Sequence, residues 1–213
     1  MPRVTALRAA FRGSKRRSIH IDGEEWRTTS AAVIRELGLS QDDEVDLREL
    51  EAALSAAEPV AARERALRLL GYREHGSKEL HTKLTDDGYP AAVAAAVTDS
   101  LVRVGLVDDE RYTSLLARTL IEGRGYGRSR AYREMTRRGI SEDDAGGCLD
   151  ALCSESTERT RALELARKWA RPGADVRKLA ARLARRGFAM GICFEAASAA
   201  VGACDHEPPD DDF

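Results

Sequence analysis

In Lys78-Glu-Leu-His-Thr-Lys-Leu84 and the Gly88-Tyr89 pair that follows it, the chain carries a pattern that it repeats twice. The glycine of each copy lies four residues beyond a large apolar residue and directly before another one, and the glycines recur after 51 and then 48 residues. The equivalent positions are Leu84, Gly88 and Tyr89, then Met135, Gly139 and Ile140, then Leu183, Gly187 and Phe188.

This spacing has a physical cause in the way that helices end. A glycine just past a helix adopts the left-handed conformation without the steric cost that a Cβ would bring. The residue four before it and the residue after it are then the pair that touch in a Schellman cap. The pattern therefore predicts three equivalent helix ends with the apolar contacts Leu84–Tyr89, Met135–Ile140 and Leu183–Phe188.

Apolar stripes at helical spacing flank each capped helix, for example Val93, Val97 and Leu101 after the first glycine. Each unit thus contains three short helices, and such units bury little surface alone and stack on their neighbours. The expected fold is all-α, an elongated and curved array of three tandem three-helix repeats with a small N-terminal β-hairpin and helix module. The expected segments are a basic flexible N-terminus (1–17), the hairpin and helix module (18–60), repeat 1 (61–104), repeat 2 (105–156), repeat 3 (157–204) and an acidic disordered tail (205–213).

The N-terminal module is predicted from a hairpin signal. Asp22-Gly23 supplies the two positive-φ positions of a type I′ turn and is expected to place Ile19 opposite Trp26. A helix from Ala31 to Leu37 should cover the hairpin, and a second from Asp46 to Ala57 should end before Pro59.

Polar residues beside the repeats are predicted to start helices. Ser77 and Asp175 are candidate N-caps of the first and third glycine-capped helices, and Ser141 with Asp144 can cap the helix after Gly139. Asp108 or Asp109 can cap the helix that opens repeat 2. These assignments account for the acidic pair without a catalytic role.

Charge is unevenly distributed in this chain of 213 residues, although the formal net charge is only −2. Residues 1–17 contain no acid, and residues 159–186 hold ten Lys or Arg against two acids. Opposite charge blocks indicate a basic face on the surface, and solvated helix faces are the plainer interpretation of any single block.

The sequence contains no run of about 18 apolar residues, so it predicts no membrane-spanning helix. Four cysteines without C-x-x-C spacing suggest reduced thiols.

Several motifs resemble those of the RecX family of recombinase regulators. Leu106-Val-Asp-Asp-Glu-Arg-Tyr112 resembles its "G-x-L-D-D-x-x-[FY]-A" stretch, and Gly127 to Ile140 its "G-x-x-R-I-x-x-E-L-x-x-K-G-I" stretch. Ala66 to Gly88 and Leu183 to Phe188 are similar to its opening and closing blocks. Ala131 and Met135 depart from the usual isoleucine and leucine, and both changes stay apolar. The resemblance covers roughly residues 18–201.

This resemblance implies a cytoplasmic, monomeric, non-catalytic protein that binds the RecA recombinase filament on single-stranded DNA. It implies restraint of the filament's ATPase, strand-exchange and co-protease activities, with no cofactor and no membrane partner. Single-stranded DNA remains an open second partner. From the charge pattern we expect a partner-binding basic face on the capped helices of repeats 2 and 3. Its candidate residues are Arg128, Arg130, Arg133, Arg137, Arg138, Lys178, Arg182, Arg185 and Arg186.

Other functions have weaker support in the sequence. The glycine-rich stretch 122–127 lacks the Gly-Lys-Ser/Thr of a phosphate loop and is better explained as a helix connector. His75 and His81 lack cysteine or carboxylate partners at metal-ligand spacing, so no metal is expected. The alternative that stays open is a direct nucleic-acid-binding protein, similar to a transcription factor, that uses its three-helix units.

Overall fold

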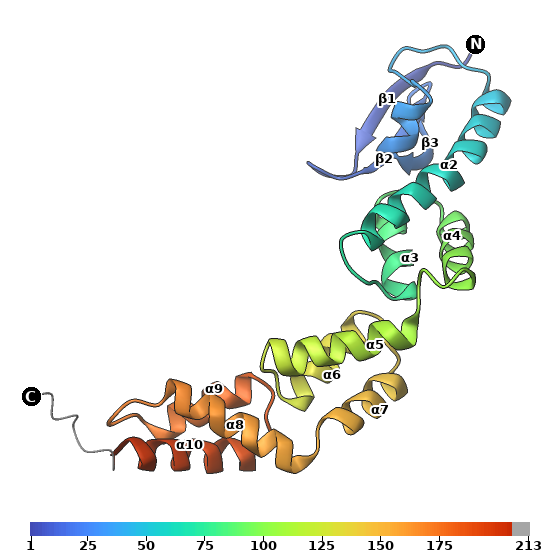
Figure 1. Cartoon of the computed structure of the whole chain (residues 1–213). Helices are drawn as coiled ribbons and strands as arrows, with labels where there is room; N and C mark the ends of the chain where they lie inside the picture. The colour runs from blue at the N-terminus through green and yellow to red at the C-terminus, as the bar shows by residue number, and fades with distance from the viewer. Residues whose placement is uncertain (206–213) are drawn as a thin grey trace, which may run out of the picture. The chain divides into compact units, whose positions relative to one another are not determined.

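The computed structural model describes residues 1–205 as two compact units, which divide after Asp109. The first unit holds a sheet and helices α1 to α4, and the second holds helices from α5 onward (Figure 1). The predicted acidic tail lies outside the described residues except for Asp205, the last residue of α10. No helix in the described part is both long and apolar enough to cross a membrane.

Three antiparallel strands form the sheet of the first unit, in the order β1 (Val4–Ala9), β2 (Arg16–Ile21) and β3 (Glu24–Ser30). The predicted turn is confirmed, since Asp22 and Gly23 both have positive φ. The predicted pairing of Ile19 with Trp26 is wrong. Ile19 pairs with Arg27 and His20 with Glu25, so Trp26 is the extra residue of a β-bulge.

Residues 4–9 were expected in a flexible N-terminus and instead form β1. The segment has only two polar residues, Thr5 and Arg8, and they do not alternate strictly with apolar ones, so its strand signal is weak. The strand forms because Val4 and Leu7 pack into the core that the sheet shares with the helices. Backbone hydrogen bonds from Val4 to Asp43 and from Val45 to Pro2 fix its start.

Helix α1 (Ala31–Glu36) begins after the N-cap Ser30 and matches the prediction closely. Helix α2 (Leu47–Leu70) does not, because it continues through Pro59 for 24 residues. Proline lacks an N–H and usually breaks a helix, but one buried stripe runs along both halves of α2. Burial on both sides of the proline outweighs the lost hydrogen bond. The residues of that stripe are Leu50, Leu54, Ala57, Glu58, Ala61, Ala62, Ala66 and Leu69.

The sheet, α1 and α2 share one core with α3 (Ser77–Asp86) and α4 (Ala91–Arg103), so the N-terminal module and repeat 1 are packed together. A buried carboxylate joins sheet and helix: Glu58 on α2 accepts from Arg27 at 2.8 Å and from the Thr29 hydroxyl at 2.8 Å. Both oxygens of this buried side chain are therefore satisfied.

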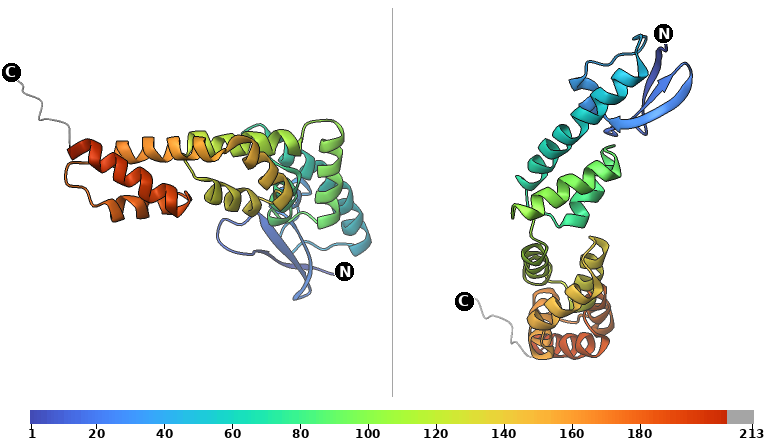
Figure 2. Two further views of the ribbon diagram at one scale, coloured as in Figure 1. Left: turned by 90° about the horizontal axis from the view of Figure 1, so that it is seen from below. Right: turned by 90° about the vertical axis from the view of Figure 1, so that its right-hand side faces the viewer.

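The second unit contains two further three-helix sets, each with its own apolar core. In the first set, α5 (Asp109–Arg118) runs into a π-helical turn, η1 (Thr119–Gly123), and is followed by α6 (Arg128–Arg137) and α7 (Glu142–Leu152). In the second, α8 (Glu155–Trp169), α9 (Val176–Arg185) and α10 (Met190–Asp205) pack side by side (Figure 2). The helical fold with three-helix units is therefore confirmed.

All three predicted glycine caps are present. Gly88, Gly139 and Gly187 have φ values of +101°, +91° and +92°. The residue after each glycine donates its N–H to the predicted partner carbonyl: Tyr89 to Leu84 at 3.1 Å, Ile140 to Met135 at 3.2 Å and Phe188 to Leu183 at 3.4 Å. These are the outer hydrogen bonds of Schellman caps, and the partner residues are fully buried.

Candidate partner-binding surface

The nine basic residues predicted to form one face divide into two groups with different surroundings. One group lies where repeat 2 meets repeat 3 inside the second unit. The other lies on α6 and α9 or at their ends, and all of its members except the partly buried Arg138 are exposed.

Close backbone contact makes the junction between these repeats. Gly127 donates its N–H to the Arg186 carbonyl at 2.9 Å, and Ser129 donates to the Gly187 carbonyl at 3.3 Å. A Cβ on Gly127 would lie 2.4 Å from the Gly187 carbonyl carbon. A Cβ on Gly187 would lie 2.4 Å from that of Arg130. Only glycine at both positions allows this approach.

The junction also caps α6. Helix α6 starts after Gly127 with no side-chain cap of its own, so its first N–H groups need partners. Arg128 donates its backbone N–H to the buried Glu158 of α8 at 2.8 Å. With the carbonyls of residues 186 and 187, the Glu158 carboxylate provides acceptors for the N–H groups at the start of α6. Repeat 3 therefore caps the start of this helix of repeat 2.

Four of the predicted arginines belong to this junction. The Arg130 guanidinium donates to the Arg185 carbonyl at 2.9 Å and lies 4.2 Å from the centre of the Tyr126 ring. Arg186 donates to the Arg124 carbonyl at 2.5 Å and lies between the rings of Tyr126 and Trp169. Arg182 stacks at 3.9 Å on Trp169. Arg128 binds Asp150 at 2.6 Å.

These contacts form a ladder of alternating guanidinium groups and aromatic rings, which we call the junction ladder: Arg182, Trp169, Arg186, Tyr126 and Arg130. Cation–π contacts of this kind are worth about 0.5–1 kcal/mol at exposed sites. The sequence could not place them, since Tyr126 and Trp169 lie in different repeats.

The remaining five residues form what we call the outward set: Arg133, Arg137, Arg138, Lys178 and Arg185. Lys178 and Arg185 have exposed side chains without an ion-pair partner among residues 1–205. Arg137 is 73% exposed and bonds Glu134 at 2.7 Å, and Arg138 approaches the same carboxylate at 3.5 Å. The hydrogen bond from Arg137, with both positive charges, holds the pKa of Glu134 below its ordinary value.

The start of α3 is capped differently from the prediction. Gly76 is its N-cap and Ser77 its first helical residue, so the predicted cap at Ser77 is wrong. Asp109 supplies the missing acceptor, taking the Ser77 N–H at 2.7 Å and its hydroxyl at 2.6 Å. The predicted caps at Ser141 and Asp175 are confirmed.

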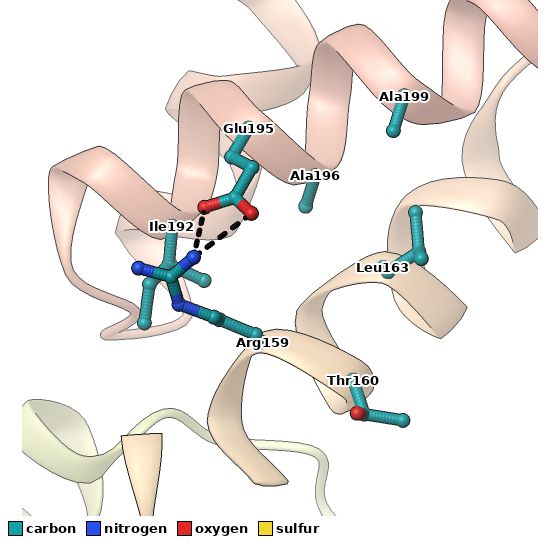
Figure 3. Close-up of a pocket in the computed structure, with 7 residues that line it drawn as sticks. All are labelled: Arg159, Thr160, Leu163, Ile192, Glu195, Ala196 and Ala199. Carbon is teal, nitrogen blue, oxygen red and sulfur yellow. Dashed lines mark hydrogen bonds and ion pairs between the residues drawn. The ribbon is translucent and has the colours of Figure 1, made fainter. Parts of the chain in front are cut away.

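A shallow groove lies between α8 and α10 (Figure 3). Leu163, Ile192 and Ala196 line it, and Arg159 bridges it through hydrogen bonds of 2.8 and 2.9 Å to Glu195. The two charges neutralise each other. Within the described residues no three His, Cys, Asp or Glu side chains gather as metal ligands would.

Comparison with known proteins agrees with this three-helix architecture. Profiles described as the first and second three-helix domains of RecX match residues 62–101 and 108–149. The regulatory protein RecX of Mycolicibacterium vanbaalenii is 33% identical over 150 residues, which cover 65% of this chain and 81% of that protein. The RecX protein of Treponema pallidum is 35% identical over 127 residues, covering 60% and 77%.

Two solved structures share the fold. A crystal structure of regulatory protein RecX covers 93% of this chain and 100% of its own, with a TM-score of 0.53 and 21% identity. RecX from Lactobacillus salivarius covers 68% and 97%, with a TM-score of 0.58 and 19% identity. The fold defines a helical-repeat protein made of three-helix units. By its matched domains and relatives, the chain belongs to the RecX family of regulatory proteins.

Proposed function

We propose that this protein binds a RecA-type recombinase filament on single-stranded DNA and restrains its ATPase, strand-exchange and co-protease activities. It acts as a cytoplasmic monomer and catalyses no reaction itself. Membership of the RecX family is the observation that carries this proposal.

The outward set supports a charged mode of binding. Lys178 and Arg185 are exposed and lack ion-pair partners in the described part of the chain, and Arg137 stays exposed beside Glu134. A nucleoprotein filament presents phosphates and acidic protein groups, which such side chains attract. Binding through them weakens as salt screens the charges.

In the acidic pair at positions 108 and 109, the contacts of Asp109 support a structural role for this carboxylate over a catalytic one. Both carboxylate oxygens of Asp109 are hydrogen-bonded to Ser77, where they cap a helix. Helix capping alone, which stabilises the fold, accounts for an aspartate at this position.

An ATPase titration tests the proposal. A RecA-type recombinase on single-stranded DNA is assayed with increasing amounts of the full chain. We expect turnover to fall to a low plateau at low salt, and the dose for half effect to rise with salt. Unchanged turnover at a saturating dose would refute the proposed function.

A gel shift of the chain alone tests the alternative of a transcription-factor-like protein. A recognition helix needs side chains free to reach base edges. Arg130 on α6, Arg182 on α9 and Arg186 just after α9 are engaged within the junction ladder. Those three side chains are therefore not free to read base edges, and the exposed cations of the outward set attract phosphates of any sequence, so we expect only unselective duplex binding. Tight selective binding without effect on the recombinase would favour the alternative.

A further inference from the structure

The sheet of the first unit has a basic end and an acidic end. The hairpin that joins β1 to β2, with the adjoining strand residues, spans residues 8–17 and contains five Lys or Arg and no acid. The turn between β2 and β3, at the other end of the strands, carries Asp22, Glu24 and Glu25. A polyanion is thus attracted to one end of the sheet and repelled by the other.

Three guanidinium groups of this basic hairpin are not engaged in the fold. Arg8, Arg12 and Arg16 are exposed and have no hydrogen-bonded or ion-paired side-chain partner within residues 1–205. By contrast, Lys15 pairs with Asp87, and Arg17 donates to the carbonyls of residues 14 and 16.

An aromatic ring lies at the tip of the same hairpin. Phe11 is 70% exposed, and the loop that carries it protrudes past the neighbouring helices of its unit (Figure 1). A phenylalanine this exposed loses the free energy of burial and contributes nothing to the core. Its neighbours in sequence include Arg12, so a ring and a free cation lie together.

The strand register continues the basic surface along one face of the sheet. Arg8 pairs with Ser18, and Ser18 pairs with Thr28, so these residues share a face with Arg16, two positions from Ser18. Residues Arg27 and Thr29 have the opposite parity and bind Glu58 of α2. The face with Arg8 and Arg16 is therefore the one turned away from α2.

Arg16 also lines a groove of about 470 Å³ between the sheet and the start of α4, and Arg27 from the opposite face of the sheet lines it too. The hydroxyl-bearing residues Thr28 and Thr85 line it too, and Pro90 and Ala91 place the start of α4 there. Helix α4 has no side-chain cap, so its first amides add positive potential to that of Arg16. The groove extends the anion-attracting surface of the hairpin.

We propose that this surface, the basic hairpin with the groove beside it, binds single-stranded nucleic acid. Arg8, Arg12 and Arg16 contact backbone phosphates, and the ring of Phe11 stacks on a base. An acidic peptide would use the cations but not the ring, whereas unpaired bases present stacking faces. This inference goes beyond the proposed function, because it needs no recombinase.

Fluorescence anisotropy of a labelled oligothymidylate with the full chain, without recombinase, tests the proposal. Replacing the arginines (Arg8→Gln, Arg12→Gln, Arg16→Gln) should weaken binding at low salt at least about tenfold and lower the log–log salt slope by about 2. Phe11→Ala should weaken it about tenfold, and Phe11→Trp should restore it.

A control variant removes the same charge elsewhere in the first unit, at exposed positions on α1, α2 and α4: Arg35→Gln, Arg48→Gln and Arg103→Gln. Its affinity should stay within about twofold of the parent, since sequence-independent attraction depends on local phosphate contacts. Far-UV circular dichroism confirms that each variant is folded. A duplex of matched charge should bind more weakly than the single strand, because its bases are already stacked.

Three results would overturn the inference: no binding by the parent chain at low salt, equal loss in the control variant, or an unaltered affinity in Phe11→Ala with polyglutamate competing as well as the oligonucleotide. The last result would assign the surface to an acidic protein. Each leaves the ATPase titration unaffected, so failure here is distinguishable from failure of the proposed function.

Discussion

Asp87 and Arg186 occupy the same place at the ends of α3 and α9, directly before the capping glycine, and carry opposite charges. Asp87 accepts from Arg65 at 2.6 Å and from Lys15 at 3.4 Å, which joins α3 to α2 and to the basic hairpin. Arg186 donates to a carbonyl of repeat 2 and lies between two aromatic rings. The cap itself accepts either charge, and the neighbour that packs against each cap determines which residue fits.

The capping glycines that follow Asp87 and Arg186 are also constrained by the element that packs against each cap. A Cβ on Gly88 would lie 2.5 Å from the carbonyl oxygen of Thr29 in β3, and one on Gly187 would lie against Arg130 in α6. One cap packs on a sheet and the other on a helix of the preceding repeat. Each glycine is thus required twice, for its positive φ and for close packing.

The largest expected effect comes from Gly187→Ala. The left-handed conformation costs an alanine about 1–2 kcal/mol and the clash about 1–3 kcal/mol more, so we expect a loss of roughly 2–5 kcal/mol. Gly173→Ala is the matched control, since its φ is +73° but its Cβ meets nothing within 4 Å. Urea unfolding followed by circular dichroism measures both; equal losses would mean that close packing contributes nothing.

Reversing the charge at Asp87 or at Arg186 tests whether the neighbouring element determines the residue at each cap. Arg186→Asp removes a charged donor from the Arg124 carbonyl, and Asp87→Arg places a third cation beside Arg65 and Lys15. Each should cost about 2 kcal/mol. Arg138→Asp, at the equivalent place after α6, should cost less, because within residues 1–205 its side chain bonds only to Glu134 on the helix that it follows. Similar losses in all three variants would contradict a neighbour-dependent role.

Helix starts allow a smaller test. Asp175 caps its own helix, whereas Asp109 caps α3 from the beginning of α5. Asp175→Ala and Asp109→Ala should each cost about 1 kcal/mol. In a double-mutant cycle, Ser77→Ala should couple to Asp109→Ala by about 0.5 kcal/mol or more. Simple additivity would show that the two side chains do not interact in solution.

The smallest expected effect is a pH dependence from Glu134. Its pKa is lower in the folded chain than in the unfolded chain, so its stabilising contribution is complete above the unfolded pKa. That contribution disappears as the pH falls through the folded pKa. Stability of the parent should therefore decline more steeply than that of Glu134→Gln below the ordinary glutamate pKa; parallel curves would rule out the effect.

What the sequence could predict was local. The caps at Gly88, Gly139 and Gly187 follow from a five-residue spacing, and the turn at Asp22-Gly23 from two adjacent residues. The errors arise from tertiary contacts. Helix α2 continues through Pro59 because a buried stripe runs along both of its halves. The start of α3 is capped by Asp109, 32 residues after Ser77, and not by Ser77 itself.

The candidate surface shows the same limit. Sequence pattern grouped nine basic residues because they recur on equivalent helices. It could not separate Arg130 and Arg186, which bind carbonyls of a neighbouring repeat, from Lys178 and Arg185, whose side chains are exposed. Tertiary packing, above all that of repeat 3 on repeat 2, distinguishes the two groups.

Affinity for a RecA-type filament, measured beside thermal stability in two variants, tests this division most directly. The outward variant (Arg137→Gln, Lys178→Gln, Arg185→Gln) should bind the filament at least about tenfold more weakly at low salt with its melting temperature unchanged. The junction variant (Arg130→Gln, Arg186→Gln) should melt several degrees lower. Full filament affinity in the outward variant, folded and at low salt, would contradict the account.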